Sequence, residues 1–245
     1  MSSGAVLVLG GRSDIGLAIA KVYAREGHAI QLAARNVETL EPDREDIALR
    51  HGVEASLHEF DALDVESHVV FVEGLPTLPE TVVCAVGALG EQEESEQDHA
   101  QARLVLRSNF EGPANILAVL ANAFEKRGCG VIIGISAVAG DRGRATNYIY
   151  GAGKAGFTAY LAGMRNRLAK KGVHVLTVKP GFVATRMTEG MDLPEKLPTD
   201  PDTLALAVFK AARARRNVVY LKPIWWLVML IIRNIPEMVF KKLKI

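Results

Sequence analysis

The chain has 245 residues, of which 49% are hydrophobic and 23% charged, a balance typical of a globular protein with one substantial core. Its two cysteines, Cys84 and Cys129, have no metal-binding spacing and imply no disulfide framework, so we expect a reducing, cytoplasmic compartment. The net charge is +1, but residues 210–245 hold nine Lys or Arg against one acid, Glu237, so residues 1–209 carry −7. The C-terminal segment therefore presents a different surface from the body.

Short apolar runs alternate with helical patterns along the whole chain. The runs expected to form strands are 6–9, 29–33, 54–60, 81–86, 130–135, 173–178 and 218–221. The expected helices are 15–26, 101–127, 147–171 and 202–213. This alternation is typical of an α/β protein with a doubly wound, Rossmann-type parallel sheet of about seven strands and helices on both faces. We expect one catalytic domain over residues 1–222, extended by an apolar and basic helical tail over 223–245, and no signal peptide before the first strand.

A glycine-rich turn joins the first expected strand to the first helix. Such a turn, with the N-terminus of the following helix, can hold a pyrophosphate through backbone N–H groups. The residues expected to contact the cofactor here are Gly10, Arg12, Ser13, Ile15 and Gly16. Asp14 occupies the place of the middle glycine in the usual dinucleotide spacing, and an ordinary strand-to-helix turn is the alternative.

The second expected strand ends at Arg35 and Asn36, where ribose specificity is set. An acid here favours the 2′-hydroxyl of NAD, and a cation favours the 2′-phosphate of NADP. Arg35, supported by Arg12, therefore predicts NADP, with NAD as the less favoured cofactor. The alternative is that Arg35 is a solvated residue at the end of a strand.

Tyr150 and Lys154 lie four residues apart in an expected helix, fourteen residues after Ser136. Residues at this spacing share one helix face. An ammonium close to a phenol stabilises the phenolate and lowers the phenol pKa towards the range useful for acid–base catalysis. Ser136, at the end of an expected strand, can add a hydroxyl to this pair. On this spacing alone, an ordinary surface Tyr and Lys would be the simpler interpretation.

Taken together, these motifs resemble the short-chain dehydrogenase/reductase family over nearly the whole chain. The resemblance implies a catalytic set of Asn109, Ser136, Tyr150 and Lys154, with Tyr150 and Lys154 also touching the cofactor. It further implies cofactor contacts at Asp61, Ala62, Ala85, Gly87, Pro180, Gly181, Val183 and Thr185. Two departures are visible: the phosphate loop lacks the family's threonine and middle glycine, and Cys84–Gly87 lacks the asparagines of the family's Asn-Asn-Ala-Gly segment.

Within the family, the chain is most similar to the decaprenylphosphoryl-2-keto-pentose reductases. That similarity rests on residues 60–64, on Ile235-Pro236 followed by 240–243, and on the absence of the Asn-Asn-Ala-Gly asparagines. It implies a ketone reductase acting on a lipid-linked keto-sugar. The family also implies a homodimer or homotetramer, and it places a substrate lid at residues 186–201, which could equally be a surface loop.

The tail carries an apolar run at 224–232 with Trp225 and Trp226, followed by basic residues. The run is too short to span a bilayer, but a helix of this composition suits the membrane interface. We therefore expect peripheral membrane contact through 223–245; packing on the body or on a partner subunit is the alternative.

The sequence offers three candidate functions. The favoured one is an NAD(P)-dependent oxidoreductase that reduces a ketone or oxidises a secondary alcohol. The second is a non-catalytic nucleotide-binding scaffold or regulator at a membrane surface, suggested by the degraded loop motifs. Nucleic-acid binding is not expected, because the tail's basic residues alternate with apolar ones and the body is acidic. No spacing of His, Cys or acids predicts a metal site.

Overall fold

Seven parallel strands form one sheet in the computed structural model, which describes residues 3–190 and 198–243. The sheet order is β3-β2-β1-β4-β5-β6-β7, so the predicted doubly wound Rossmann-type sheet is confirmed. The strands are β1 (Ser3–Leu9), β2 (His28–Ala34), β3 (Ala55–Glu59), β4 (Thr81–Cys84), β5 (Gly130–Ile135), β6 (Val173–Lys179) and β7 (Val218–Tyr220). Each lies within a few residues of its predicted range.

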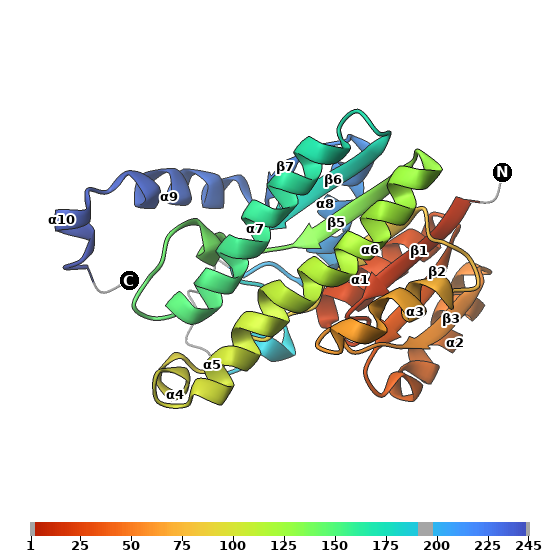
Figure 1. Ribbon diagram of the computed structural model, residues 1–245, viewed down its shortest axis with the longest axis horizontal. Coiled ribbons are helices and arrows are strands. Elements are labelled where there is room, and N and C mark those ends of the chain that lie inside the picture. The colour runs from red at the N-terminus through yellow and green to blue at the C-terminus, as the bar shows by residue number, and fades with distance from the viewer. Residues whose placement is uncertain (1–2, 191–197, 244–245) are drawn as a thin grey trace.

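Helices cover both faces of this sheet (Figure 1). Successive side chains of a strand point to opposite faces, so Val6 and Val8 of β1 pack with helices on one face and Leu7 and Leu9 with helices on the other. The first layer contains α1 (Asp14–Arg25), α2 (Glu41–His51) and α8 (Pro201–Arg213). The second contains α3 (His68–Glu73), α6 (Gly112–Arg127) and α7 (Tyr148–Leu168).

The helix expected over residues 101–127 is interrupted. It divides into α5 (His99–Leu106), a π-helical turn η3 (Arg107–Glu111) and α6, preceded by a short α4 (Gln92–Gln97). Turns of this kind insert an extra residue into a helix and are frequent at functional sites. Here the turn carries Asn109. The remaining short 3₁₀ helices are η1 (Val37–Leu40), η2 (Val65–Ser67), η4 (Val138–Asp141) and η5 (Arg186–Thr188).

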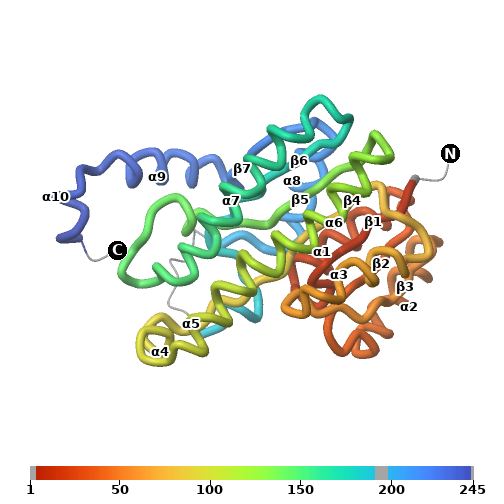
Figure 2. Tube along the Cα trace, viewed as in Figure 1, coloured from red at the N-terminus to blue at the C-terminus, as the bar shows by residue number. Residues whose placement is uncertain are grey.

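The tail forms two helices, α9 (Pro223–Asn234) and α10 (Glu237–Phe240), that project beyond the sheet (Figures 1 and 2). One side of α9 packs on the body through Trp225 and Met229, which contact Val138 of η4. The other side exposes large apolar side chains to solvent, namely Ile224, Trp226, Leu227, Leu230 and Ile231. Among the described residues, no helix is both long and apolar enough to cross a membrane.

Arg142, just after η4, holds the tail in place. Its guanidinium donates to the carbonyls of Ile232 and Ile235, both at 2.6 Å, and pairs with Glu237 at 2.8 Å. It also lies 3.6 Å from the ring centroid of Phe240. The projecting tail is therefore fixed to the loop that precedes α7, on the side of the molecule where the predicted catalytic residues lie.

A buried ion pair supports this same region. The Lys179 ammonium lies 2.5 Å from the Asp141 carboxylate, and both side chains are almost fully buried. The Tyr220 hydroxyl donates to the second oxygen of Asp141 at 2.7 Å. Burial, together with this carboxylate, raises the pKa of Tyr220 to about 12. The contacts join β6, β7 and η4, from which the tail and the cavity wall both extend.

Candidate active site

A cavity of about 600 Å³ opens at the carboxyl ends of the parallel strands. This edge of a doubly wound sheet is where such folds bind their ligands. The cavity brings together nearly all of the predicted site residues: Gly10, Arg12, Ser13, Ile15, Arg35, Asp61, Ala62, Ala85, Gly87, Asn109, Ser136, Tyr150, Lys154, Pro180, Gly181, Val183 and Thr185. Gly16 and Asn36, which were also predicted to contact the cofactor, do not line it.

The phosphate loop has the geometry that a pyrophosphate requires. Gly10 has a φ of 85°, and a Cβ there would lie 2.9 Å from the backbone of Ala85, so only glycine fits. Ser13 caps α1 by accepting from the backbone N–H of Gly16 at 2.9 Å. Gly16 therefore has a structural position beneath the loop. The N-terminus of α1 points into the cavity with its dipole favouring an anion.

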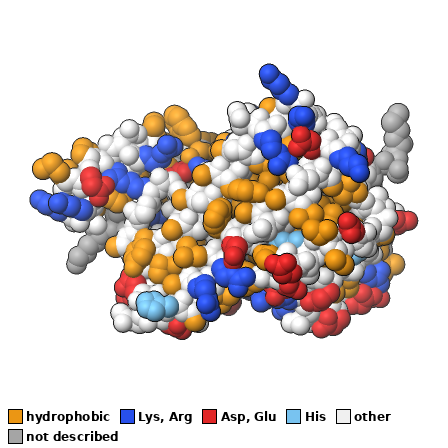
Figure 3. All heavy atoms as spheres, in the orientation of Figure 1, with side chains coloured by type: hydrophobic (Ala, Val, Ile, Leu, Met, Phe, Trp, Pro, Cys, Tyr) orange, Lys and Arg blue, Asp and Glu red, His pale blue; other side chains and the backbone are white. Residues whose placement is uncertain are grey.

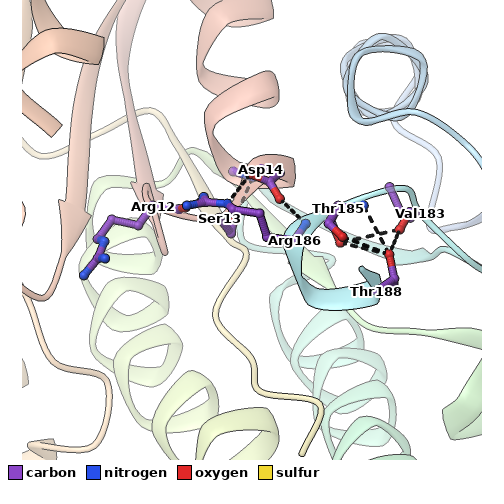
Figure 4. Close-up of polar contacts among 8 residues, drawn as sticks. Arg12, Ser13, Asp14, Val183, Thr185, Arg186 and Thr188 are labelled. Carbon is purple, nitrogen blue, oxygen red and sulfur yellow. Dashed lines mark hydrogen bonds and ion pairs between the residues drawn. The ribbon is translucent and has the colours of Figure 1, made fainter. Parts of the chain in front are cut away.

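Asp14, the acid that replaces the family's middle glycine, is paired with Arg186 from beyond β6 (Figure 4). The Arg186 guanidinium lies 2.9 Å from the carboxylate and donates to the Arg12 carbonyl at 2.5 Å, and the Arg186 backbone N–H donates to Asp14 at 2.8 Å. An acid beside a pyrophosphate would repel it, and this pairing offsets that charge. Arg186 was not predicted, because it lies far from Asp14 in sequence.

The contacts of Arg186 with Asp14 and Arg12 also hold the first residue of the predicted lid, residues 186–201, in place. Thr188 closes η5 by donating to the Val183 carbonyl at 2.6 Å, and Val183 forms a bridge with Thr199. Of the range 186–201, residues 191–197 lie outside the described part of the chain. Of its described ends, Arg186 and Thr188 are held at the cavity, and Thr199 is held through Val183.

Two cations gather where the adenosine half of a dinucleotide would lie. The Arg12 guanidinium donates to the main-chain carbonyl of Arg35 at 3.4 Å, and both residues line the cavity. The Arg12 side chain points away from Arg186, as Figure 4 shows. Asp61 lies nearby and accepts from the backbone N–H of Leu63 at 2.9 Å. A guanidinium group suits a phosphate better than a ribose hydroxyl.

Tyr150 and Lys154 lie in the first two turns of α7 and face the cavity. The Lys154 ammonium is buried, lies 5.8 Å from the Tyr150 ring centroid and donates to the Ile135 carbonyl at 3.0 Å. Burial lowers the pKa of Lys154 to about 8. Burial raises the pKa of Tyr150, opposite to the direction predicted from the neighbouring ammonium. The phenol is therefore protonated at neutral pH, as a proton donor must be.

Asn109 lies beside this lysine. Its amide nitrogen donates to the carbonyls of Ala88 at 2.6 Å and Val105 at 2.8 Å, while its buried side-chain oxygen has no partner. A Cβ on Gly87 would lie 2.7 Å from that oxygen and 3.2 Å from the Lys154 ammonium. The oxygen and the ammonium therefore flank one small space. An acceptor and a donor so placed suit a bridging water.

The Ser136 hydroxyl forms hydrogen bonds with two residues of α7. It lies 3.1 Å from the Lys154 carbonyl, to which it donates, and 2.6 Å from the Thr158 hydroxyl. In this arrangement the hydroxyl bonds to helix atoms and the residue lines the cavity, so its expected bond to a ketone oxygen stays a prediction. Sequence spacing located the residue at the strand end, but it could not specify which way the side chain turns.

Three further cavity-lining residues with polar groups, besides Arg186, were not predicted from the sequence. Arg144 and Asn147 lie between η4 and α7, and Trp225 enters from α9. Each has a buried polar side-chain atom without a hydrogen-bond partner, namely Arg144 Nε, Asn147 Oδ1 and Trp225 Nε1. The two polar residues before Tyr150 were a local signal that could have been used. No sequence pattern places Trp225 beside Gly181.

A glycine turn, two arginines and a Tyr–Lys pair line one cavity at this sheet edge, as expected of a dinucleotide-dependent oxidoreductase. Comparison with known protein families supports this class. The chain matches the family model for short chain dehydrogenases over residues 4–196. It therefore belongs to the short-chain dehydrogenase family and is an NAD(P)-dependent oxidoreductase.

Similar proteins cover nearly its full length. It is 34% identical over 243 residues to an uncharacterized oxidoreductase of Mycobacterium tuberculosis, covering 97% of this chain and 96% of the relative. It is also 34% identical to an uncharacterized oxidoreductase of Streptomyces coelicolor, covering 97% and 95%. A short-chain dehydrogenase from Sphingobium yanoikuyae in complex with NADPH has the same fold, with a TM-score of 0.82 at 22% identity, covering 96% and 97%.

The buried Lys154 makes the free energy of unfolding depend on pH. Its folded pKa of about 8 lies below the value of 10.5 for a free lysine, so the unfolded chain binds more protons between these values and stability rises with pH there. From about pH 7 to about pH 9.5 we expect the wild type to gain about 2 kcal/mol relative to Lys154→Met. Urea unfolding of both proteins at the two pH values measures this. Parallel pH profiles would contradict the burial of a charged lysine.

Proposed function

We propose that this protein reduces a ketone with NADPH, using Tyr150 as the proton donor. The observation that carries the proposal is the convergence of Tyr150, Lys154 and Asn109 on one end of the cavity, next to Gly87. The phosphate loop, with the φ of 85° at Gly10, and the two arginines at the ribose end fit a phosphorylated dinucleotide. When bound, the nicotinamide supplies the hydride.

The chain's own residues supply placement and a proton. The protonated Tyr150 phenol donates to the ketone oxygen as negative charge develops there. Lys154 places a positive charge beside the phenol and stabilises the phenolate that remains. The unpartnered Asn109 oxygen holds a water beside Lys154, through which the lost proton is replaced. Ser136 supports α7 through the Lys154 carbonyl and Thr158.

The exposed face of α9 supports a membrane-near substrate. Figure 3 shows apolar and basic side chains gathered on the projecting tail. Trp226 and Ile231 are 56% and 58% exposed, with Arg233, Lys241 and Lys242 following. Amphipathic helices with this composition bind the interface of anionic bilayers. We therefore propose that the tail docks the enzyme at a membrane, next to a lipid-linked keto-sugar.

Tyr150→Phe removes the proton donor and leaves the ring in place. We expect turnover of a ketone panel with NADPH to fall by about two to four powers of ten, while NADPH binding, followed by cofactor fluorescence, stays within about threefold. Ser136→Ala, which removes a bond to α7, is expected to lose less than about tenfold in turnover, and also to lower the free energy of unfolding. Retention of more than about a tenth of the rate by Tyr150→Phe would overturn the acid assignment.

Arg35→Asp exchanges a cation for an acid at the ribose end. The acid repels a 2′-phosphate and accepts from a 2′-hydroxyl. We expect kcat/KM for NADPH to fall by about tenfold or more and the preference to move towards NADH. Arg25→Asp, on the exposed end of α1 outside the cavity, is the control for the same charge change. An unchanged ratio of the two cofactors in Arg35→Asp would contradict the NADP proposal.

Flotation with liposomes tests the tail. The double variant Trp226→Glu/Ile231→Glu places charges on the exposed face of α9, and we expect its binding to vesicles containing phosphatidylglycerol to fall by about tenfold or more. The matched control is Leu49→Glu/Val70→Glu, at positions 84% and 72% exposed elsewhere on the body. Equal flotation of wild type and tail variant would contradict membrane docking. A smaller particle in light scattering, with no change in flotation, would instead indicate that α9 packs on a second copy.

A further inference from the structure

Arg144 is a cation in the cavity wall without an acid to neutralise it. Its Nε is buried without a partner, and no carboxylate among the described residues pairs with it. Burial lowers the pKa of its guanidinium. The two acids that line the cavity are engaged at the nucleotide end, where Asp14 pairs with Arg186 and Asp61 accepts from Leu63. A partly desolvated cation of this kind is costly unless a ligand brings the negative charge.

Trp225 adds a buried donor to the same wall. The side chain is only 6% exposed, and its indole N–H has no acceptor. The ring lies against Gly181, where a Cβ would come within 2.1 Å of Nε1, and packs on Phe182 at a centroid distance of 5.6 Å. Buried indole N–H groups normally find an acceptor. Because the residue lines the cavity, the acceptor we expect for this donor is a ligand atom.

Asn147 contributes the third unsatisfied group, a buried side-chain oxygen at the N-terminus of α7. It lies three residues before Tyr150. An amide oxygen accepts from a hydroxyl or an N–H. Arg144 and Trp225, in the same cavity wall, each offer a donor, whereas the free atom of Asn147 is an acceptor.

All three residues lie on the catalytic side of the cavity. The nucleotide side is built by the ends of β1, β2 and β3, whereas these residues extend from β5, from α9 after β7, and from the entry to α7. In the sheet order β4 separates the two sides. The three residues therefore lie on the Tyr150 side of the cavity, at a distance along the sheet from the cations Arg12 and Arg35.

We propose that Arg144, Asn147 and Trp225 form an anchor for an anionic oxygen group, a phosphate, on a hydroxylated ketone substrate. Arg144 and the Trp225 N–H donate to the phosphate oxygens, and the Asn147 oxygen accepts from a substrate hydroxyl. The inference rests on the proposed function in one respect: the carbonyl of the same molecule is the one that Tyr150 protonates. The phosphate belongs either to a small phosphorylated ketone or to a lipid-linked sugar.

A matched pair of ketones tests the anchor in turnover. Dihydroxyacetone phosphate and dihydroxyacetone differ only by the phosphate, and we expect the wild type with NADPH to favour the former by about tenfold or more in kcat/KM. Arg144→Gln is expected to remove most of that preference. The control Arg103→Gln, an exposed position on α5 outside the cavity, is expected to retain it. A preference that is absent from the wild type, or unchanged in Arg144→Gln, would overturn the anchor.

A binding measurement separates this proposal from the proposed reaction. In Trp226→Phe the chain keeps Trp225 as its single tryptophan, so its fluorescence reports on the anchor. With the full chain saturated with NADP⁺, titration with inorganic phosphate is expected to give a saturable change that Arg144→Gln weakens by about tenfold or more. If Tyr150→Phe gives the same saturable fluorescence change with phosphate as its parent but has lost turnover, the phosphate response supports the anchor. The lost turnover then supports the proposed reaction separately. A phosphate response that is absent, or that persists in Arg144→Gln, overturns the anchor even if ketones are reduced.

The source of the phosphate is distinguished in the same assay. Farnesyl phosphate carries the same phosphate on an apolar chain. Binding at least about tenfold tighter than inorganic phosphate, and sensitive to Arg144→Gln, supports the anchor and identifies a lipid-linked substrate. If farnesyl phosphate and inorganic phosphate bind with equal affinity, and Arg144→Gln weakens both equally, the result supports the anchor and identifies a free phosphorylated ketone as the substrate.

Discussion

The close approach of α7 to η4 and η3, beside the end of β5, fixes the geometry of the site. Glycines permit it: a Cβ on Gly140 would lie 2.7 Å from the carbonyl carbon of Lys154, and one on Gly153 would lie 2.8 Å from the Asn109 side chain. The approach removes the Lys154 ammonium from water and leaves the Ile135 carbonyl as its acceptor. An apolar residue would pack there at lower cost. The buried lysine therefore does not serve stability, which supports the role in binding and chemistry proposed for it.

The phosphate loop shows how a departure from the family pattern can be compensated at a distance. Asp14 stands where the family has glycine, which by itself suggests a weakened nucleotide site. Arg186 supplies both the opposite charge and a donor to the Arg12 carbonyl, so the acid becomes the means by which the segment after β6 is fastened to the loop. The same contact closes one side of the cavity. An altered phosphate-loop motif is therefore compatible with an intact nucleotide site. The hypothesis of a non-catalytic nucleotide-binding scaffold, which rested on the altered loop motifs, loses its main support.

Sequence patterns predicted the features that depend on neighbouring residues. The seven strands were recognisable because strands buried on both faces form continuous apolar runs, and the Tyr150–Lys154 pair because its spacing defines one helix face. The π-helical turn at Asn109 escaped notice because one extra residue barely disturbs a helical pattern. The Asp14–Arg186 contact could not be predicted, since 172 positions separate the two and no local signal specifies such a contact.

The tail connects the cavity to its surroundings. On α9, Trp225 closes the cavity against Gly181, while the adjacent Trp226 faces solvent, because consecutive residues of a helix point about 100° apart. One helix thus contributes both a wall of the site and an exposed apolar face, and Arg142 fixes it to the loop that carries Arg144. Any surface that binds the exposed face lies within a helix width of the substrate end. A substrate delivered from that surface would reach Tyr150 without crossing the nucleotide half of the cavity.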